Sequence, residues 1–283
     1  MSQIQNKAML ATLNCSQWSA RKLDKRVSKE IEQTHQAKDA GRFNKLLISG
    51  EALKPIVNLV GKIRSYHDNV TLPWMDDGKR ILPAKLYLEY TQQMRVMRDE
   101  FNRLVSEFVQ DYPTMIKEAR LRLGTMYDPN EYPSPDVIRG KFDMTVRFEP
   151  VPDAADFRVD ISDDDVKAIR ADITRNIASQ QLVALQHCWT RLREVVSKIE
   201  ERLSDPEAIF RDSLIDNARE LVKVLPALNL LGDPELEAAR ADVEHRLCMA
   251  SPQRLRTDKA VRAQTAQAAH DILNQMQKYA AAA

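Results

Sequence analysis

Two long stretches of helical periodicity constrain the fold of this 283-residue chain more than any other feature. In the first, from about Ala84 to Asp111, apolar residues recur at intervals of three or four; they are Leu86, Tyr90, Met94, Met97, Phe101, Leu104 and Phe108. At about 1.5 Å per residue this pattern predicts roughly 40 Å of amphipathic helix. Pro113 predicts a kink or a restart, because proline cannot donate to the helical ladder, and the stripe then continues to Gly124.

The second stretch begins after Ser162 and has the same character. Its apolar face is formed by Val166, Ile169, Ile173, Ile177, Ala184, Cys188, Leu192, Val195, Ile199 and Leu203. Ser162 can cap this helix, and the three acids at 163–165 fit the positive end of the helix dipole. Two long helices with matching apolar stripes predict an antiparallel helical hairpin.

Between the two helices, at 127–161, the apolar period changes from helical to alternating. Prolines exclude a helix there, and two runs alternate apolar with polar residues: Phe142, Met144, Val146 and Phe148, then Phe157, Val159 and Ile161. We expect a small antiparallel sheet at the tip of the hairpin, completed by a weak strand at 9–15.

Shorter helices flank this hairpin in the prediction. They cover Ser19–Lys38, ended by Gly41, and Glu51–His67, followed by an Asp-Gly loop at 71–80; beyond 204 they cover Glu207–Leu225, Glu235–Met249 and a last helix from Pro252 to about Tyr279. The first two of the later three begin at Asp-Pro-Glu, which combines a cap with a proline at the first helical position. The sequence therefore predicts a mostly α protein in three consecutive segments, 1–83, 84–204 and 205–283.

Composition excludes several classes of protein. Seven glycines are too few for Gly-rich phosphate loops, and three widely spaced cysteines do not form a disulfide framework. Charges interrupt every apolar run before the roughly 18 residues that a membrane helix needs, and no secretory signal is apparent. We expect a cytoplasmic protein without a membrane partner.

Charge is distributed unevenly along the chain. Residues 1–65 carry 12 Lys+Arg against 5 Asp+Glu, whereas residues 126–165 carry 4 against 11. The two regions either remain as opposite poles or neutralise each other, within the fold or between subunits.

The basic region is the strongest candidate for a binding surface. It combines cations with aromatic rings, Phe43 among them, as proteins that bind single-stranded nucleic acid do. The predicted contacts are Trp18, Arg21, Lys22, Lys25, Arg26, Lys29, Arg42 and Lys45, extended by Lys79 and Arg80 in the Asp-Gly loop. The alternative is that these cations only pair with the acidic 126–165 segment.

The first apolar stripe is the candidate surface for self-association. We expect a homo-oligomer formed through Leu86, Tyr90, Met94, Met97 and Phe101. Together with the basic region, this predicts a binding or assembly protein whose partner is single-stranded DNA or an acidic host or phage protein. A scaffold or a protein-binding inhibitor of host machinery, without nucleic-acid contact, is the alternative.

No catalytic pattern is evident. His245 and Cys248 have the spacing of two metal ligands, but no second pair accompanies them, and Cys188 beside His187 lies on the apolar stripe, which favours a buried structural thiol. The acids at 163–165 are explained by helix capping. We predict a protein that is not an enzyme and has no cofactor and no metal.

Several local phrases resemble a group of bacteriophage and prophage proteins with no assigned activity. They lie at 18–22, 41–45, 72–74, 132–135, 150–152 and 210–213. The resemblance spans nearly the whole chain. It implies expression in a bacterial cytoplasm during phage growth and supplies no catalytic residues.

Overall fold

The computed structural model describes residues 4–75, 77–156, 159 and 162–282. The chain divides into two compact units that alternate along the sequence: unit 1 comprises Met1–Thr12, His67–Tyr90 and Arg147–Ala283, and unit 2 comprises Leu13–Tyr66 and Thr91–Val146. This division differs from the three consecutive segments predicted, because distant parts of the sequence pack together. No helix in the described part of the chain is both long and apolar enough to cross a membrane.

The prediction of a mostly α protein with a small antiparallel sheet is confirmed. The larger sheet has the strand order β4-β5-β1-β6, formed by Leu72–Pro73, Arg80–Pro83, Ala8–Ser16 and Asp143–Pro150. β5 pairs antiparallel with β1 and with β4, and Gly78 has a φ of 80° in the turn between β4 and β5, a value that favours glycine. The N-terminal strand and the alternation at 142–148 are therefore confirmed as strands. Val159 is in no strand, and Phe157 and Ile161 lie outside the described residues.

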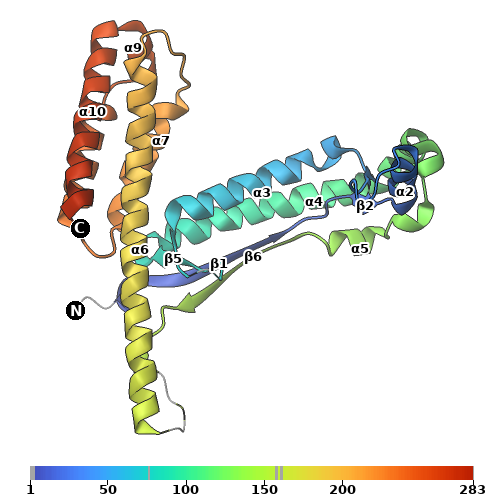
Figure 1. Ribbon diagram of the computed structural model, residues 1–283, viewed down its shortest axis with the longest axis horizontal. Helices are drawn as coiled ribbons and strands as arrows, with labels where there is room; N and C mark the ends of the chain where they lie inside the picture. The colour runs from blue at the N-terminus through green and yellow to red at the C-terminus, as the bar shows by residue number, and fades with distance from the viewer. Residues whose placement is uncertain (1–3, 76, 157–158, 160–161, 283) are drawn as a thin grey trace. The chain divides into compact units, whose positions relative to one another are not determined.

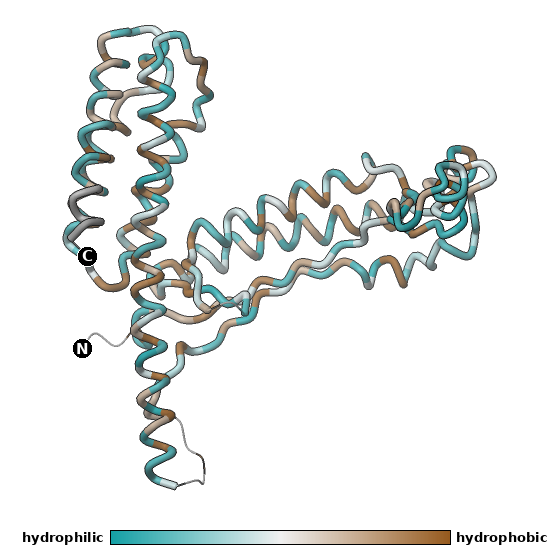
Figure 2. The backbone as a smooth tube through the Cα atoms, viewed as in Figure 1, coloured by the Kyte–Doolittle hydropathy of each residue, from teal (hydrophilic) through white to brown (hydrophobic). Residues whose placement is uncertain are grey.

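Unit 1 is dominated by helices packed on one another. They are α6 (Asp163–Ser204), α7 (Ser213–Leu228), α8 (Pro234–Leu247), α9 (Pro252–Thr257) and α10 (Lys259–Ala282), with α10 and α7 beside α6 in Figure 1. Figure 2 shows hydrophilic and hydrophobic residues alternating along α6 and α10, as expected of helices that bury one face.

The expected pairing of the two long helices is wrong. Cys188, Leu192 and Val196 of α6 are fully buried in a cluster with residues of α7, α8 and α10, and this cluster contains no described residue of α4 (Tyr87–Leu123). The apolar stripe of α6 is thus covered by the C-terminal helices, which offered equally apolar faces. Periodicity identified both long helices but could not identify their partners.

Helix starts in unit 1 show where capping signals succeed and fail. Ser162 caps α6 through Asp165 N–H, and Asp233 caps α8 through the N–H groups of Glu235 and Leu236. The predicted start at Asp205 is wrong, since α7 begins at Ser213. The carbonyls of Asp205 and Ala208 accept hydrogen bonds from the guanidinium of Arg262, which holds this segment as a loop against α10. The last predicted helix is split into α9 and α10 at Asp258, whose side chain caps α10.

Unit 2 contains most of α3 (Gly50–Val70) and of α4, which run side by side in Figure 1. Ile56, Val60 and Ile63 of α3 are 1% exposed or less, as are Phe101 and Tyr112 of α4. α4 continues through Pro113 as one helix, so the predicted restart does not occur. The remaining short elements are α1 (Ile4–Lys7), α5 (Pro135–Arg139), and the 3-10 turns η1 (Ala84–Leu86), η2 (Gly124–Met126), η3 (Pro129–Glu131) and η4 (Ala154–Asp156).

The predicted self-association stripe is part of the internal core. Tyr90 is fully buried and Met94 and Phe101 are 3% and 1% exposed, while Leu86 and Met97 are partly buried. Tyr90, Met94 and Phe101 are thus covered by other residues of the same chain, and self-association through this stripe stays a prediction.

Candidate nucleic-acid interface

The basic region of the sequence folds into a small ribbon of two strands and one helix in unit 2. We call it the basic ribbon: β2 (Arg21–Leu23), α2 (Lys25–Thr34), β3 (Asn44–Leu46) and the connecting residues 35–43. The predicted helix at 19–38 is correct only for its middle. Its first residues form β2, antiparallel to β3 with Lys22 opposite Lys45, because the helix cannot begin before its cap.

Asp24 sets the start of α2. Its carboxylate accepts hydrogen bonds from the N–H groups of Arg26 and Val27, each at 3.1 Å. These bonds, with Val27 the largest cause, hold the pKa of Asp24 below its usual value. Two further bonds tie the returning chain to the same turn: Asp24 N–H donates to Phe43 C=O at 2.9 Å, and Phe43 N–H donates to the Ser28 hydroxyl at 3.0 Å.

Six predicted contact residues are exposed on this ribbon: Arg21, Lys22, Lys25, Arg26, Lys29 and Arg42. Within the described residues none of the six has an ion-pair partner; Arg26 makes one long hydrogen bond, 3.4 Å, to the carbonyl of Thr125. At about 100° per residue, Lys25, Lys29 and Arg26 occupy an arc of about 100° on α2, and Ser28 lies about 60° from Lys25. The segment with Arg42 and Phe43, bonded to Ser28, therefore borders the cationic arc.

The first turn of α2 concentrates positive charge unusually. It holds Lys25 and Arg26 and no acid, although the helix dipole favours acids there. α2 also has no buried residue, so packing does not explain the choice of these side chains. Charge that weakens the helix and contributes nothing to a core is typical of a surface that binds anions.

Lys45 is the predicted contact that the structure removes from this surface. Its side chain is 5% exposed, and its Nζ lies 2.6 Å from Oε2 of Glu131, 3.5 Å from Oδ2 of Asp24 and 2.8 Å from the carbonyl of Met126. Burial works to lower the pKa of Lys45, but Glu131 and Asp24 outweigh it and the pKa is raised. Among the predicted contact residues, the pairing with the acidic 126–165 segment that the sequence left open thus occurs at Lys45, with Glu131, and at Lys79, with Glu149.

Trp18 is likewise engaged by the fold. It is partly buried, and its ring packs edge-on against Phe108 at 6.3 Å and Tyr112 at 5.8 Å between ring centroids. Trp18 therefore anchors the chain just before β2 to the core of unit 2. Phe43, an apolar aromatic residue of the ribbon, is 36% exposed.

Lys79 and Arg80 belong to unit 1 and are engaged there. Lys79 Nζ lies 2.8 Å from Oε2 of Glu149, and Arg80 donates to the Thr71 hydroxyl at 2.6 Å and pairs with Asp68 at 3.3 Å. Burial lowers the pKa of Arg80. Their predicted role in extending the basic surface stays a prediction.

Two cysteines of unit 1 and His245 are engaged by the fold. Cys188 is fully buried, and burial raises its pKa to about 12, while burial raises the pKa of Cys248 to about 11. The Nδ1 of His245 lies 2.8 Å from the carbonyl of Ala241, within its own helix. No group of three or more His, Cys, Asp or Glu in the described part of the chain is placed to hold a metal ion.

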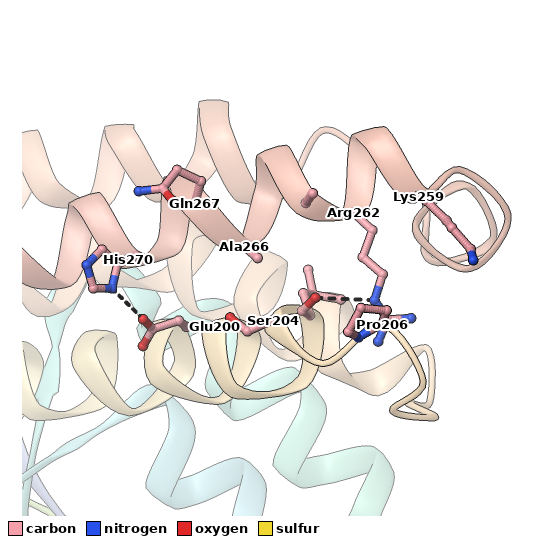
Figure 3. A pocket seen from close by; sticks show the side chains of 10 residues that line it. Glu200, Ser204, Pro206, Lys259, Arg262, Ala266, Gln267 and His270 are labelled. Carbon is pink, nitrogen blue, oxygen red and sulfur yellow. Dashed lines mark hydrogen bonds and ion pairs between the residues drawn. The ribbon is translucent and has the colours of Figure 1, made fainter.

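A pocket of about 440 Å³ lies in unit 1 between the end of α6 and the start of α10. Figure 3 shows Glu200 and His270 facing each other across it, with 2.7 Å between Oε1 and Nδ1, and Arg262 at its other end. Arg262 is 7% exposed and donates to the carbonyls of Arg202 and Leu203. Its guanidinium closes the C-terminus of α6, so the polar groups here are used by the fold and indicate no particular ligand.

Comparison of the chain with protein-family models, with curated proteins and with solved structures gave no match. The resemblance to phage proteins therefore stays a prediction, and the function has to be argued from the basic ribbon itself. The sequence pattern includes Phe43 in the basic region, but the predicted nucleic-acid contacts contain Trp18 and not Phe43. The sequence signal that could have distinguished the two aromatic residues is the N-cap of α2. Because α2 begins at Asp24, Trp18 lies outside this helix, before β2, where it packs on Phe108 and Tyr112.

Proposed function

We propose that this chain is a non-enzymatic nucleic-acid accessory protein that binds the phosphate backbone through its basic ribbon. The observation that carries the proposal is the set of six exposed cations, which lack ion-pair partners among the described residues and border one helix start. Between Arg21 and Lys45 there are 8 Lys+Arg and 4 Asp+Glu, and one buried cation, Lys45, is already neutralised by Asp24 and Glu131. The positive charge that remains faces solvent, where phosphates replace condensed counterions.

Binding of a fluorescein-labelled single-stranded oligonucleotide of about 20 nucleotides, followed by anisotropy at rising salt, tests this proposal. Each phosphate contact on a single strand contributes a slope of about −0.7 in log K against log salt. We expect replacement of Arg21, Lys22, Lys25, Lys29 and Arg42 by Ala to reduce the slope by about 3 and to abolish binding at about 150 mM salt.

A matched control removes the same number of exposed cations from unit 1. The control replaces Arg193, Lys198, Arg211, Lys223 and Lys259 by Ala, all of them exposed. It changes net charge equally, so unchanged binding by this variant shows that position matters and not total charge. Equal losses in both variants, or no salt-dependent binding by the wild-type protein, would overturn the proposal.

A protein partner is the second candidate, and one observation favours it. The ribbon exposes apolar side chains among its cations, namely Ile31 at 42% and Leu46 at 39%. Exposed apolar groups surrounded by charge are common where proteins bind one another. Failure of oligonucleotide binding, with retention of an acidic protein partner that is lost in the five-cation variant, would favour this candidate.

A further inference from the structure

Phe43 is the aromatic residue that the basic ribbon leaves open to solvent. The residue is 36% exposed, whereas Trp18 packs on Phe108 and Tyr112. Its backbone is fixed from both sides, because its carbonyl accepts from Asp24 N–H at 2.9 Å and its N–H donates to the Ser28 hydroxyl at 3.0 Å. An exposed ring on a fixed backbone loses little conformational entropy when a flat ligand covers it.

The ring of Phe43 lies beside the cations that a bound phosphate backbone would contact. Arg42 precedes it directly, and the Ser28 bond brings it to the edge of the arc formed by Lys25, Lys29 and Arg26. Cations that follow a backbone, together with a ring on which one base can stack, are the combination that binds single strands. In a duplex the base faces are already stacked, so a side-chain ring reaches them only at the cost of unstacking.

We propose that Phe43 stacks on an unpaired base and makes the basic ribbon selective for single-stranded over double-stranded nucleic acid. This inference rests on the proposed function, since the cations supply the affinity and the ring supplies the selectivity. It identifies the ligand class as a strand with at least one base free of pairing. The ring is sequence-tolerant, because every base offers a π face.

The test compares one variant on two probes. We expect Phe43→Ala to weaken binding to a single-stranded oligo-dT by about ten-fold and to change binding to a duplex of equal length by less than about two-fold. The slope of log K against log salt stays unchanged, because no phosphate contact is removed. Leu46→Ala is the matched control, since Leu46 is an exposed apolar residue of the same ribbon without an aromatic ring; we expect it to bind both probes as the wild type does.

A second variant reports the stack directly. We expect Phe43→Trp to retain single-strand affinity and to show fluorescence quenching by the single strand, beyond that of the wild-type protein with its three native tryptophans. Equal loss of single-strand and duplex binding in Phe43→Ala, or no extra quenching in Phe43→Trp, would overturn the stacking proposal. In that case the five-cation variant would still lose binding, so the proposed function would stand; if the wild type binds neither probe, the proposed function itself fails.

Discussion

Four arginines of unit 1 and the exposed cations of the basic ribbon in unit 2 are used in opposite ways. The four arginines of unit 1 donate to backbone carbonyls: Arg262 at the end of α6, Arg219 to Cys248 and Ala250 after α8, and Arg191 and Arg80 to carbonyls at the end of α3. These carbonyls have no partner within their own helices. In the ribbon six cations are exposed, and among the described residues one of them, Arg26, has a carbonyl partner, that of Thr125, through a long hydrogen bond of 3.4 Å.

The contrast teaches that cation count alone does not identify a binding surface. Lys22 and Lys45 make the point most directly, since they lie opposite each other on β2 and β3. Lys45 is buried between Asp24 and Glu131, whereas Lys22 is exposed. The two residues are of one type and share one register position, but one stabilises the fold and the other is free to contact a ligand.

Replacement of Lys45 by Met gives the largest effect that we expect. It leaves the carboxylates of Asp24 and Glu131, 10% and 17% exposed, without their shared cation. Breaking a buried pair from one side costs about 4 kcal/mol of unfolding free energy. Urea denaturation at pH 7 measures it.

Lys22→Met is the matched control, because it makes the same substitution across the strand pair. We expect the free energy of unfolding to change by less than about 0.5 kcal/mol, as at other exposed positions. Equal effects of the two substitutions would contradict the assignment of different roles to these lysines.

Replacement of Arg262 by Ala tests the structural use of cations in unit 1. Arg262 is 7% exposed and donates to the carbonyls of Arg202, Leu203, Asp205 and Ala208. We expect a loss of about 3 kcal/mol, because one buried and three part-buried carbonyls lose a charged donor. Thermal unfolding measures it, and Lys259→Ala, an exposed cation on the same helix, should leave the melting temperature unchanged. A melting temperature unchanged in Arg262→Ala would show that water replaces the guanidinium without cost.

The fold class was predictable because long amphipathic helices depend on local periodicity. The stripes of α4 and α6, the cap at Ser162 and the strand at 143–150 all follow from neighbouring residues. The partners of those helices were not predictable, since any apolar stripe can cover any other. The start of α7 was missed for a related reason: the loop at 205–208 is bonded to Arg262, more than 50 residues away, a contact that the local pattern does not encode.

The candidate site was predictable in charge but not in detail. A surplus of cations before residue 65 identified the ribbon, and six of its residues are exposed as expected. Burial of Lys45 depends on Glu131, about 86 positions later, and the position of Trp18 depends on Phe108 and Tyr112. Contacts at such separations leave no signal in the local pattern.

A smaller effect is expected from acid, through the buried His67. It is 4% exposed, its Nδ1 lies 2.8 Å from the Tyr90 hydroxyl, and burial, aided by Arg80, lowers its pKa to about 4. The unfolded chain binds a proton near pH 6.5 and the folded chain does not, so stability is complete above pH 6.5 and falls as the pH drops towards 4. We expect a loss of about 2 kcal/mol at pH 5 relative to pH 7.5.

His67→Gln isolates this contribution, because other groups titrate over the same range. The difference in unfolding free energy between pH 7.5 and pH 5 should shrink by about 2 kcal/mol in the variant, whatever its stability at pH 7.5. Urea denaturation at the two pH values measures both proteins. An identical difference in the variant would show that His67 becomes protonated in the folded state without penalty.

The smallest expected effect has the opposite sign and concerns the ribbon. Lys25 lies in the first turn of α2 and one helical turn from Lys29, so it is disfavoured by the helix dipole and by a like charge. We expect Lys25→Glu to raise the free energy of unfolding by about 0.5 kcal/mol and Lys25→Gln to raise it by about half as much. Both variants should bind the single-stranded oligonucleotide more weakly, with Glu the weaker of the two. A gain in stability paired with a loss in binding is the result expected of a residue retained for its ligand. A loss of stability in Lys25→Glu would instead place Lys25 with Lys45, among the cations that hold the fold together.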